Sequence, residues 1–170
     1  MKYVFGPVPF RKLARSLGIN PILPKTCNFS CVYCQLGRTT NFTNERMMFF
    51  LEEIIKEVKI VIEIEKKIDF ITIAGDGEPT LYFGLSTYEG IIKISSISIA
   101  IITNGALLYQ EDVRTDFLDA DIVKPAFVAL NEIFFRTIDR PHKDITLEKL
   151  IKGLKIFRIE YKDEILLKAI

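Results

Sequence analysis

Short apolar runs alternate with longer amphipathic segments along the chain. The short runs are rich in β-branched residues, as buried strands are, and they cover residues 17–23, 70–74, 98–103, 122–130 and 165–170. The longer segments repeat apolar residues at helical spacing, over about 51–67, 109–119, 131–138 and from 146 onward, with a weaker pattern over 84–95. Strands that alternate with helices and read as continuous apolar runs indicate a parallel sheet covered by helices. The pattern therefore predicts one α/β domain over residues 1–170, with about five parallel strands.

The charge balance narrows the classes of partner. Lys and Arg number 23, Asp and Glu number 22, and the net charge is +1. A nucleic acid partner is not indicated, because proteins that coat nucleic acid are usually strongly basic. The most apolar stretch, residues 91–102, is 12 residues long and contains Lys93, so it is too short and too polar to span a bilayer. With no export signal in the sequence, we expect a cytoplasmic protein with no membrane association.

Three cysteines carry the strongest chemical signal. Cys27, Cys31 and Cys34 form a C-x3-C-x2-C pattern within eight residues, and the chain has no other cysteine. An odd number in so short a segment does not form a disulfide framework. Thiolates are the preferred ligands of iron–sulfur clusters, and three of them on a tight loop can hold three corners of a cubane [4Fe–4S] cluster. The fourth iron would then be open to a substrate or a cofactor.

Two other interpretations of the cysteines stay open from the residues alone. A zinc site of three cysteines and one histidine would need His142, the single histidine, which is 108 residues beyond Cys34. Structural zinc sites usually pair their ligands in two separated knuckles. The three thiols could also be structural and bind nothing.

The motif and its surroundings resemble one family. The C-x3-C-x2-C pattern with Tyr33 directly before the last cysteine is similar to the motif of the radical S-adenosylmethionine (radical SAM) superfamily. Residues 75–80, Gly-Asp-Gly-Glu-Pro-Thr, follow the 70–74 strand and resemble the Gly-Gly-Glu type motif of that superfamily. Residues 6–9, 18–20 and 34–40 resemble a poorly characterised iron–sulfur oxidoreductase branch, distantly similar to the tRNA wybutosine-synthesising enzymes.

This resemblance implies a fold, two cofactors and a reaction. The fold would be a partial (βα) barrel with helices outside, and the cofactors a [4Fe–4S] cluster and SAM. An electron from the cluster, delivered by a donor such as ferredoxin or flavodoxin, would cleave SAM to a 5′-deoxyadenosyl radical. That radical would abstract hydrogen from an unknown substrate.

The resemblance also assigns residues. Cys27, Cys31 and Cys34 would bind three irons. The SAM-binding residues would be Tyr33 beside the adenine, Gly77 and Glu78 at the methionine amino group, and Gly75, Thr103 and Asn104.

Without the cysteines, these SAM-binding residues would have plainer explanations. Gly75 and Gly77 are typical of a strand-to-helix turn, and Glu78 of a first-turn charge favoured by the helix dipole. Residues 103–105 read as a turn. For Arg140 and His142, a solvated loop is a better interpretation than substrate contact.

The sequence departs from the family pattern in three ways. Five strands are predicted where the superfamily core usually has six, so we expect the last strand and a C-terminal region to be missing. Ala126 and Val128 stand where similar proteins commonly have Ser and Asp, and Phe10 and Ala14 where Ser and Gly are expected. A non-catalytic or degenerate iron–sulfur protein is therefore the alternative to an enzyme. An apolar strand edge at 165–170 predicts a second copy or a partner protein that covers it.

Overall fold

The main sheet has the predicted parallel core. A computed structural model describes residues 1–10, 13–48, 51–65, 67–83 and 96–168. Within them the sheet order is β1-β2-β5-β6-β7-β8, with β1 antiparallel to β2 and every other pairing parallel. The strands are β1 (Val4–Phe10), β2 (Ala14–Ile19), β5 (Phe70–Ile73), β6 (Ser98–Thr103), β7 (Ile122–Pro125) and β8 (Glu164–Ile165). This mixed α/β architecture is a partial barrel that is not closed, as expected.

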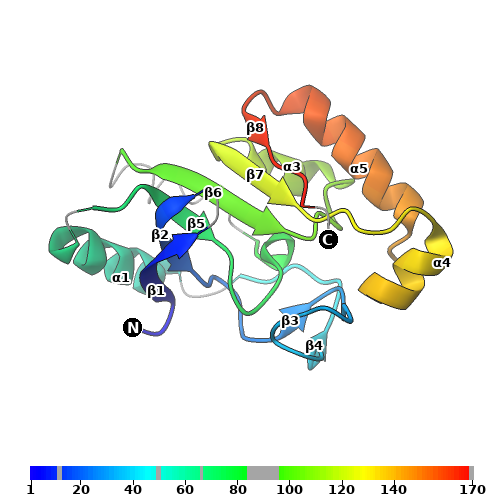
Figure 1. The fold of residues 1–170 in the computed structure, drawn as a ribbon, viewed down its shortest axis with the longest axis horizontal. Coiled ribbons are helices and arrows are strands. Elements are labelled where there is room, and N and C mark those ends of the chain that lie inside the picture. The colour runs from blue at the N-terminus through cyan, green and yellow to red at the C-terminus, as the bar shows by residue number, and fades with distance from the viewer. Residues whose placement is uncertain (11–12, 49–50, 66, 84–95, 169–170) are drawn as a thin grey trace.

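Helices connect the strands as the apolar spacing predicts. Thr146 caps the last helix, since its Oγ1 accepts a 3.2 Å hydrogen bond from Lys149 N. The helical segments are α1 (Leu51–Ile64), the 3-10 turn η1 (Pro79–Leu81), α3 (Glu111–Phe117), α4 (Glu132–Phe134), the π-helical segment η3 (Phe135–Asp139) and α5 (Leu147–Glu160). Figure 1 shows α1 and α5 at opposite ends of the main sheet. Residues 84–95, where a weak helix was expected, lie outside the described residues. Across the described part of the chain, the helices are too short or too polar to cross a membrane.

The two faces of the sheet differ in what covers them. Because successive strand side chains point to opposite faces, Ile101 and Val123 join the large core formed with the helices. Ala100 and Ile122 face the other way, in a smaller cluster with Leu13. The helices therefore cover one face, and the opposite face is the inner face of the partial barrel.

The predicted first strand was wrong at both ends. The strand covers Ala14–Ile19 instead of 17–23, because Pro21 and Pro24 lack the N–H that a central strand needs. Ile22 is nevertheless buried in the core from a loop, which explains why its segment looked strand-like. Strand β1 was not predicted, since its two prolines and glycine hide a strand that is tolerated at a sheet edge.

Three elements predicted in the C-terminal part are shorter or less regular in the structure. The strand predicted over 122–130 ends at Pro125, and the helix predicted over 131–138 is α4 followed by the π-helical η3. The strand predicted over 165–170 is only Glu164–Ile165, with an isolated bridge between Lys168 and Ala126. Residues 169–170 lie outside the described part.

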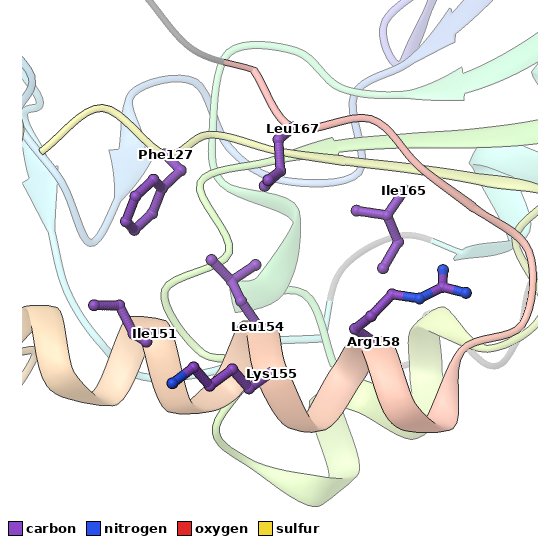
Figure 2. Close-up of a pocket in the computed structure, with 7 residues that line it drawn as sticks. All are labelled: Phe127, Ile151, Leu154, Lys155, Arg158, Ile165 and Leu167. Carbon is purple, nitrogen blue, oxygen red and sulfur yellow. The ribbon is translucent and has the colours of Figure 1, made fainter. Parts of the chain in front are cut away.

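A hollow of about 410 Å³ lies between α5 and the segment that follows it. Figure 2 shows its apolar lining, to which Ile151 and Leu154 contribute from α5, and Phe127, Ile165 and Leu167 from the facing segments. Leu167 is 60% exposed. The hollow carries no cysteine and none of the predicted site residues, so the site lies elsewhere.

Candidate cluster and cofactor site

A small second sheet closes the cysteine loop at its base. Strands β3 (Thr26–Cys27) and β4 (Asn41–Phe42) pair in parallel, with Cys27 opposite Phe42. The Asn41 side chain also donates a 3.1 Å hydrogen bond to Thr26 Oγ1. In Figure 1 this pair lies apart from the main sheet. The pairing holds the two ends of the 28–40 loop side by side, and the apolar pattern had not predicted it.

Turns inside the loop fix the cysteines relative to one another. Cys34 N donates to Cys31 O at 3.2 Å, and Gly37 N donates to Cys34 O at 3.0 Å. Gly37 has a φ of +76°, a conformation that glycine adopts without strain. The Thr39 hydroxyl donates to Phe29 O at 2.6 Å. Local hydrogen bonds therefore help to shape the loop.

The segment after α4 supports the loop from one side. Val32 N donates to Ile138 O at 2.9 Å, and His142 N donates to Asn28 O at 2.8 Å. The Tyr33 hydroxyl donates to Asp139 Oδ1 at 2.6 Å. Asp139 was missed in the sequence, where it read only as part of a polar loop, because nothing local marks it as the partner of a residue 106 positions earlier.

The three cysteines are free and half-buried. Burial raises the pKa of Cys27, and the nearby charge of Glu78 raises it further. Burial likewise raises the pKa of Cys31 to about 12. Without a bound cation these two thiols stay protonated at neutral pH, so a metal that binds them must displace protons.

Glu78 joins the carboxyl ends of β5 and β6. Its side chain is 4% exposed, and Oε1 accepts hydrogen bonds from Thr80 N at 2.9 Å, from the Thr80 hydroxyl at 2.8 Å and from the Thr103 hydroxyl. Oε2 accepts from Asn104 N at 2.8 Å. Burial raises the pKa of Glu78, and these donors oppose the increase because they stabilise the ionised form.

Asn104 connects this carboxylate to the cysteine loop. Its Nδ2 donates to Asn28 Oδ1 at 2.7 Å and lies 3.8 Å from Cys27 Sγ. Asn28 is fully buried. The structure thus brings Glu78, Thr103 and Asn104 together with Cys27, and adds Asn28, whose signal in the sequence was only its place beside Cys27.

Close packing explains both glycines of the 75–78 loop. Gly75 has a φ of +145°, and a Cβ there would lie 2.7 Å from the Asn20 side chain. A Cβ on Gly77 would lie 2.2 Å from Ile22 Cγ2 and 2.8 Å from Thr26 O. Both glycines let this loop pack against the segment that leads into Cys27. Asn20 Oδ1 is buried there without a hydrogen-bond partner among the described residues.

The ligand geometry bears on the choice between zinc and a cluster. Within the described residues no three His, Cys, Asp or Glu side chains converge on the position of a single ion. His142 instead lies against the Phe42 ring, with 5.5 Å between ring centroids. Tetrahedral zinc needs four ligands around one ion, whereas the cysteines of a cubane cluster each bind a different iron. The described residues therefore show no preformed four-ligand site for a single ion.

Fold and loop together define the class of protein. It is a partial (βα) barrel in which a loop with three free cysteines, Glu78 and Asn104 all lie beyond the carboxyl ends of parallel strands. The family model of the Radical SAM superfamily matches residues 22–167, and the chain belongs to this superfamily.

The chain is similar to longer proteins. It is 46% identical over 169 residues to a UPF0026 protein of Methanocaldococcus jannaschii, an alignment that covers 98% of this chain and 53% of that protein. It is 36% identical over 165 residues to a UPF0026 protein of Synechocystis, covering 95% of this chain and 62% of the relative. The chain therefore spans little more than half the length of these relatives.

Solved structures share its fold. A structure of TYW1 with a lysine-pyruvate adduct bound has a TM-score of 0.64 and 17% identity, covering 91% of this chain and 55% of that one. A structure of anSMEcpe with bound AdoMet also has a TM-score of 0.64, with 20% identity and 89% and 42% coverage. At these identities the likeness shows the fold alone.

Proposed function

We propose that this chain is the cluster- and SAM-binding part of a radical SAM enzyme. The observation that carries the proposal is the hydrogen-bond path from Glu78 through Asn104 to within 3.8 Å of Cys27 Sγ. Such a path supports a single site in which Glu78 would accept an ammonium group and Cys27 would bind an iron. When bound, the cluster and SAM supply one-electron cleavage of SAM to a 5′-deoxyadenosyl radical for hydrogen abstraction from an unknown substrate.

Each cysteine would hold one iron of a [4Fe–4S] cluster. With Cys27, Cys31 and Cys34 assigned, the chain offers no fourth cysteine, so one iron stays open to the amino and carboxylate groups of SAM. The Asn104 side chain donates toward Cys27 and would stabilise the thiolate form of that ligand. The low exposure of the loop base would limit access of water to the sulfur atoms.

Glu78 would accept the ammonium group of SAM. A carboxylate has about four lone-pair sites, and Oε2 accepts only from Asn104 N among the described contacts. The Thr80 and Thr103 hydroxyls on Oε1 can rotate, since a hydroxyl both donates and accepts. Thr103 would orient the carboxylate through its hydrogen bond to Oε1. Gly75 and Gly77 would allow the backbone to approach SAM closely, and Tyr33 would lie beside the adenine of SAM.

A non-catalytic iron–sulfur protein is the second candidate. Ala126 and Val128 are apolar at positions where similar proteins commonly have polar side chains, and Ala126 forms a bridge with Lys168. Among the described residues that follow β7, positions 126 to 128 then offer no polar side chain for a substrate. A cluster with only structural or electron-transfer use would fit this feature.

Anaerobic reconstitution tests the proposal. The loaded protein should contain about four irons and four sulfides per chain, and each of the variants Cys27→Ala, Cys31→Ala and Cys34→Ala should lose most of them. Ser30→Ala is the matched control, because it changes the same loop and keeps all three thiols. Stoichiometric zinc without iron uptake would contradict the assignment.

Turnover then separates the two candidates. Reduction of the loaded protein with dithionite in the presence of SAM should release 5′-deoxyadenosine, measured by chromatography. A stable cluster that releases none would favour the non-catalytic protein.

A further inference from the structure

Lys124 lies on the inner face of the partial barrel. In the same strand, Ile122 packs in the small inner cluster and Val123 in the large core. Because side chains alternate between the two faces of a strand, Lys124 shares the inner face with Ile122. Lys124 is half-buried. Strand β7 has a neighbouring strand on each side, so a lysine is not needed there to protect a sheet edge.

Lys168 lies on the same face, one strand away. Leu166 packs in the inner cluster, whereas Leu167 lines the hollow beside α5. Lys168 N donates to Pro125 O at 2.9 Å, which continues the parallel ladder, so alternation places the Lys168 side chain on the inner face. Lys168 forms a bridge with Ala126 and is therefore a diagonal neighbour of Lys124.

The two lysines can reach one group. With strands about 4.8 Å apart and a rise of about 3.3 Å per residue, their Cα atoms lie roughly 8 Å from each other. Each ammonium group stands on a flexible four-carbon stem. Both can therefore donate to oxygen atoms of a single small anion.

Neither ammonium group has a hydrogen-bond or ion-pair partner among the described residues. Other polar groups on this face are paired, since the Ser16 and Thr72 hydroxyls bond to each other. Glu164 begins β8 level with Ile122, and its carboxylate forms no ion pair with either lysine in the described part of the chain. The two positive charges are thus left for solvent or a ligand.

The position of the lysines connects them to the candidate site. Lys124 immediately precedes Pro125, which pairs with Thr103, and the Thr103 hydroxyl donates to Glu78. Toward the amino ends of the strands, the inner face is the apolar cluster that contains Ala100 and Ile122. In (βα) barrels the substrate binds at the carboxyl ends of the strands. The lysines lie at this end of the inner face.

We propose that Lys124 and Lys168 form a subsite for an anionic group of the substrate, a phosphate or a carboxylate. The inference rests on the proposed function, whose substrate is unknown, and it states what chemistry one end of that substrate carries. The two ammonium groups would donate charge-assisted hydrogen bonds to its oxygen atoms. Such a subsite supplies the polar contact that positions 126 to 128 lack.

Labelling with pyridoxal 5′-phosphate tests the subsite, because this reagent carries both an aldehyde and a phosphate. A lysine amine and the aldehyde condense to an imine with loss of water, borohydride reduces the imine to a stable amine, and peptide mass spectrometry locates it. Pyridoxal, which lacks the phosphate, is the matched probe. The ratio of labelling by the two probes should be about tenfold higher at Lys124 than at Lys59, which is exposed on α1, since a charged hydrogen-bond partner contributes roughly 10- to 150-fold in affinity.

Variants and competitors locate the anion. Lys168→Met removes the second charge and should lower the ratio at Lys124 to that of Lys59. Lys152→Met, at an exposed position of α5, should leave the ratio unchanged. Inorganic phosphate and acetate compete for the subsite, and the one that protects Lys124 more strongly identifies the group as a phosphate or a carboxylate. Equal ratios at Lys124 and Lys59, or protection by neither anion, would overturn the subsite.

The carboxylate of SAM is the other anion expected near this end of the barrel. Calorimetry on the cluster-loaded Lys124→Met variant should give a SAM affinity within a few-fold of the wild type. A tenfold loss would assign the lysine to the carboxylate of SAM and overturn the substrate subsite. A wild type that takes up no cluster would instead contradict the proposed function, whereas the labelling ratios need no cluster and decide the subsite by themselves.

Discussion

The Tyr33 hydroxyl donates a 2.6 Å hydrogen bond to Oδ1 of Asp139. The bond joins the cysteine loop to the end of η3, and Asp139 is only 3% exposed. Burial raises the pKa of Asp139, while the hydrogen bond from Tyr33 favours the ionised carboxylate. This contact therefore ties the conformation of the loop to a segment that lies far away in the sequence.

Replacing Tyr33 with Phe should destabilise the protein. The change removes the hydroxyl that donates to the buried carboxyl group of Asp139, which costs about 1–3 kcal/mol. Urea unfolding of the metal-free protein measures this loss in the free energy of unfolding. Tyr109→Phe is the control, because the Tyr109 hydroxyl only accepts a 3.2 Å bond from its neighbour Gln110. Equal effects of the two changes would mean that the Tyr33 contact adds no stability.

Glu78→Gln should weaken SAM binding while the cluster remains. The amide replaces one acceptor oxygen with a donor, and loss of a charged hydrogen-bond partner costs about 1.5–3 kcal/mol, or roughly 10- to 150-fold in affinity. Calorimetry on the cluster-loaded protein measures the affinity for SAM. Thr80→Val removes a donor to the same carboxylate but keeps the charge, so it should change stability and leave SAM affinity within a few-fold. Unchanged SAM affinity in Glu78→Gln would restrict Glu78 to capping η1.

Gly153→Ala should destabilise α5 instead of stabilising it. Alanine is ordinarily favoured over glycine inside a helix by about 1 kcal/mol. Here a Cβ would lie 2.5 Å from Tyr109 N and 2.7 Å from Leu108 C, so the helix or the loop must shift, at about 1–3 kcal/mol. Thermal unfolding beside the exposed control Lys152→Ala measures the difference. A higher melting temperature for Gly153→Ala would show that the loop yields without cost.

Glu57 should make stability depend on acid pH. Burial raises the pKa of Glu57, but backbone N–H groups of Lys2, Tyr3 and Val4, at 2.8 to 3.1 Å, lower it by more, and the net shift is downward. The stabilisation is complete above the unfolded value of about 4.3 and is lost as pH falls through the lower folded value.

The variant Glu57→Gln isolates this contribution. It should lower the free energy of unfolding by about 1 kcal/mol at neutral pH, because solvent screens a partly exposed carboxylate. Its stability should also decline less steeply below pH 4 than that of the wild type. Glu45→Gln, at an exposed position outside the helices, should change neither quantity, and parallel acid profiles of the wild type and Glu57→Gln would contradict the assignment.

The order of residues along the chain is enough to predict the parallel α/β core and to reveal the cysteine motif. Alternating apolar runs depend only on neighbours along the chain, so β5 and β6 were predicted close to their observed bounds and α5 close to its observed start. The spacing of Cys27, Cys31 and Cys34 is likewise local. So is the turn chemistry of the 75–80 segment, on which the family resemblance rested.

Tertiary packing alone decided how the site is held. The contacts of Tyr33 with Asp139 and of Asn104 with Asn28 join segments 106 and 76 positions apart, and no local pattern encodes such pairs. The short β3–β4 pairing and the early end of β7 likewise depend on competition between hydrogen bonds in the folded chain. Lys124 and Lys168 become neighbours only because β8 and the residues after it pair in parallel with β7. Local periodicity thus specified the elements, and long-range packing specified which polar groups meet at their carboxyl ends.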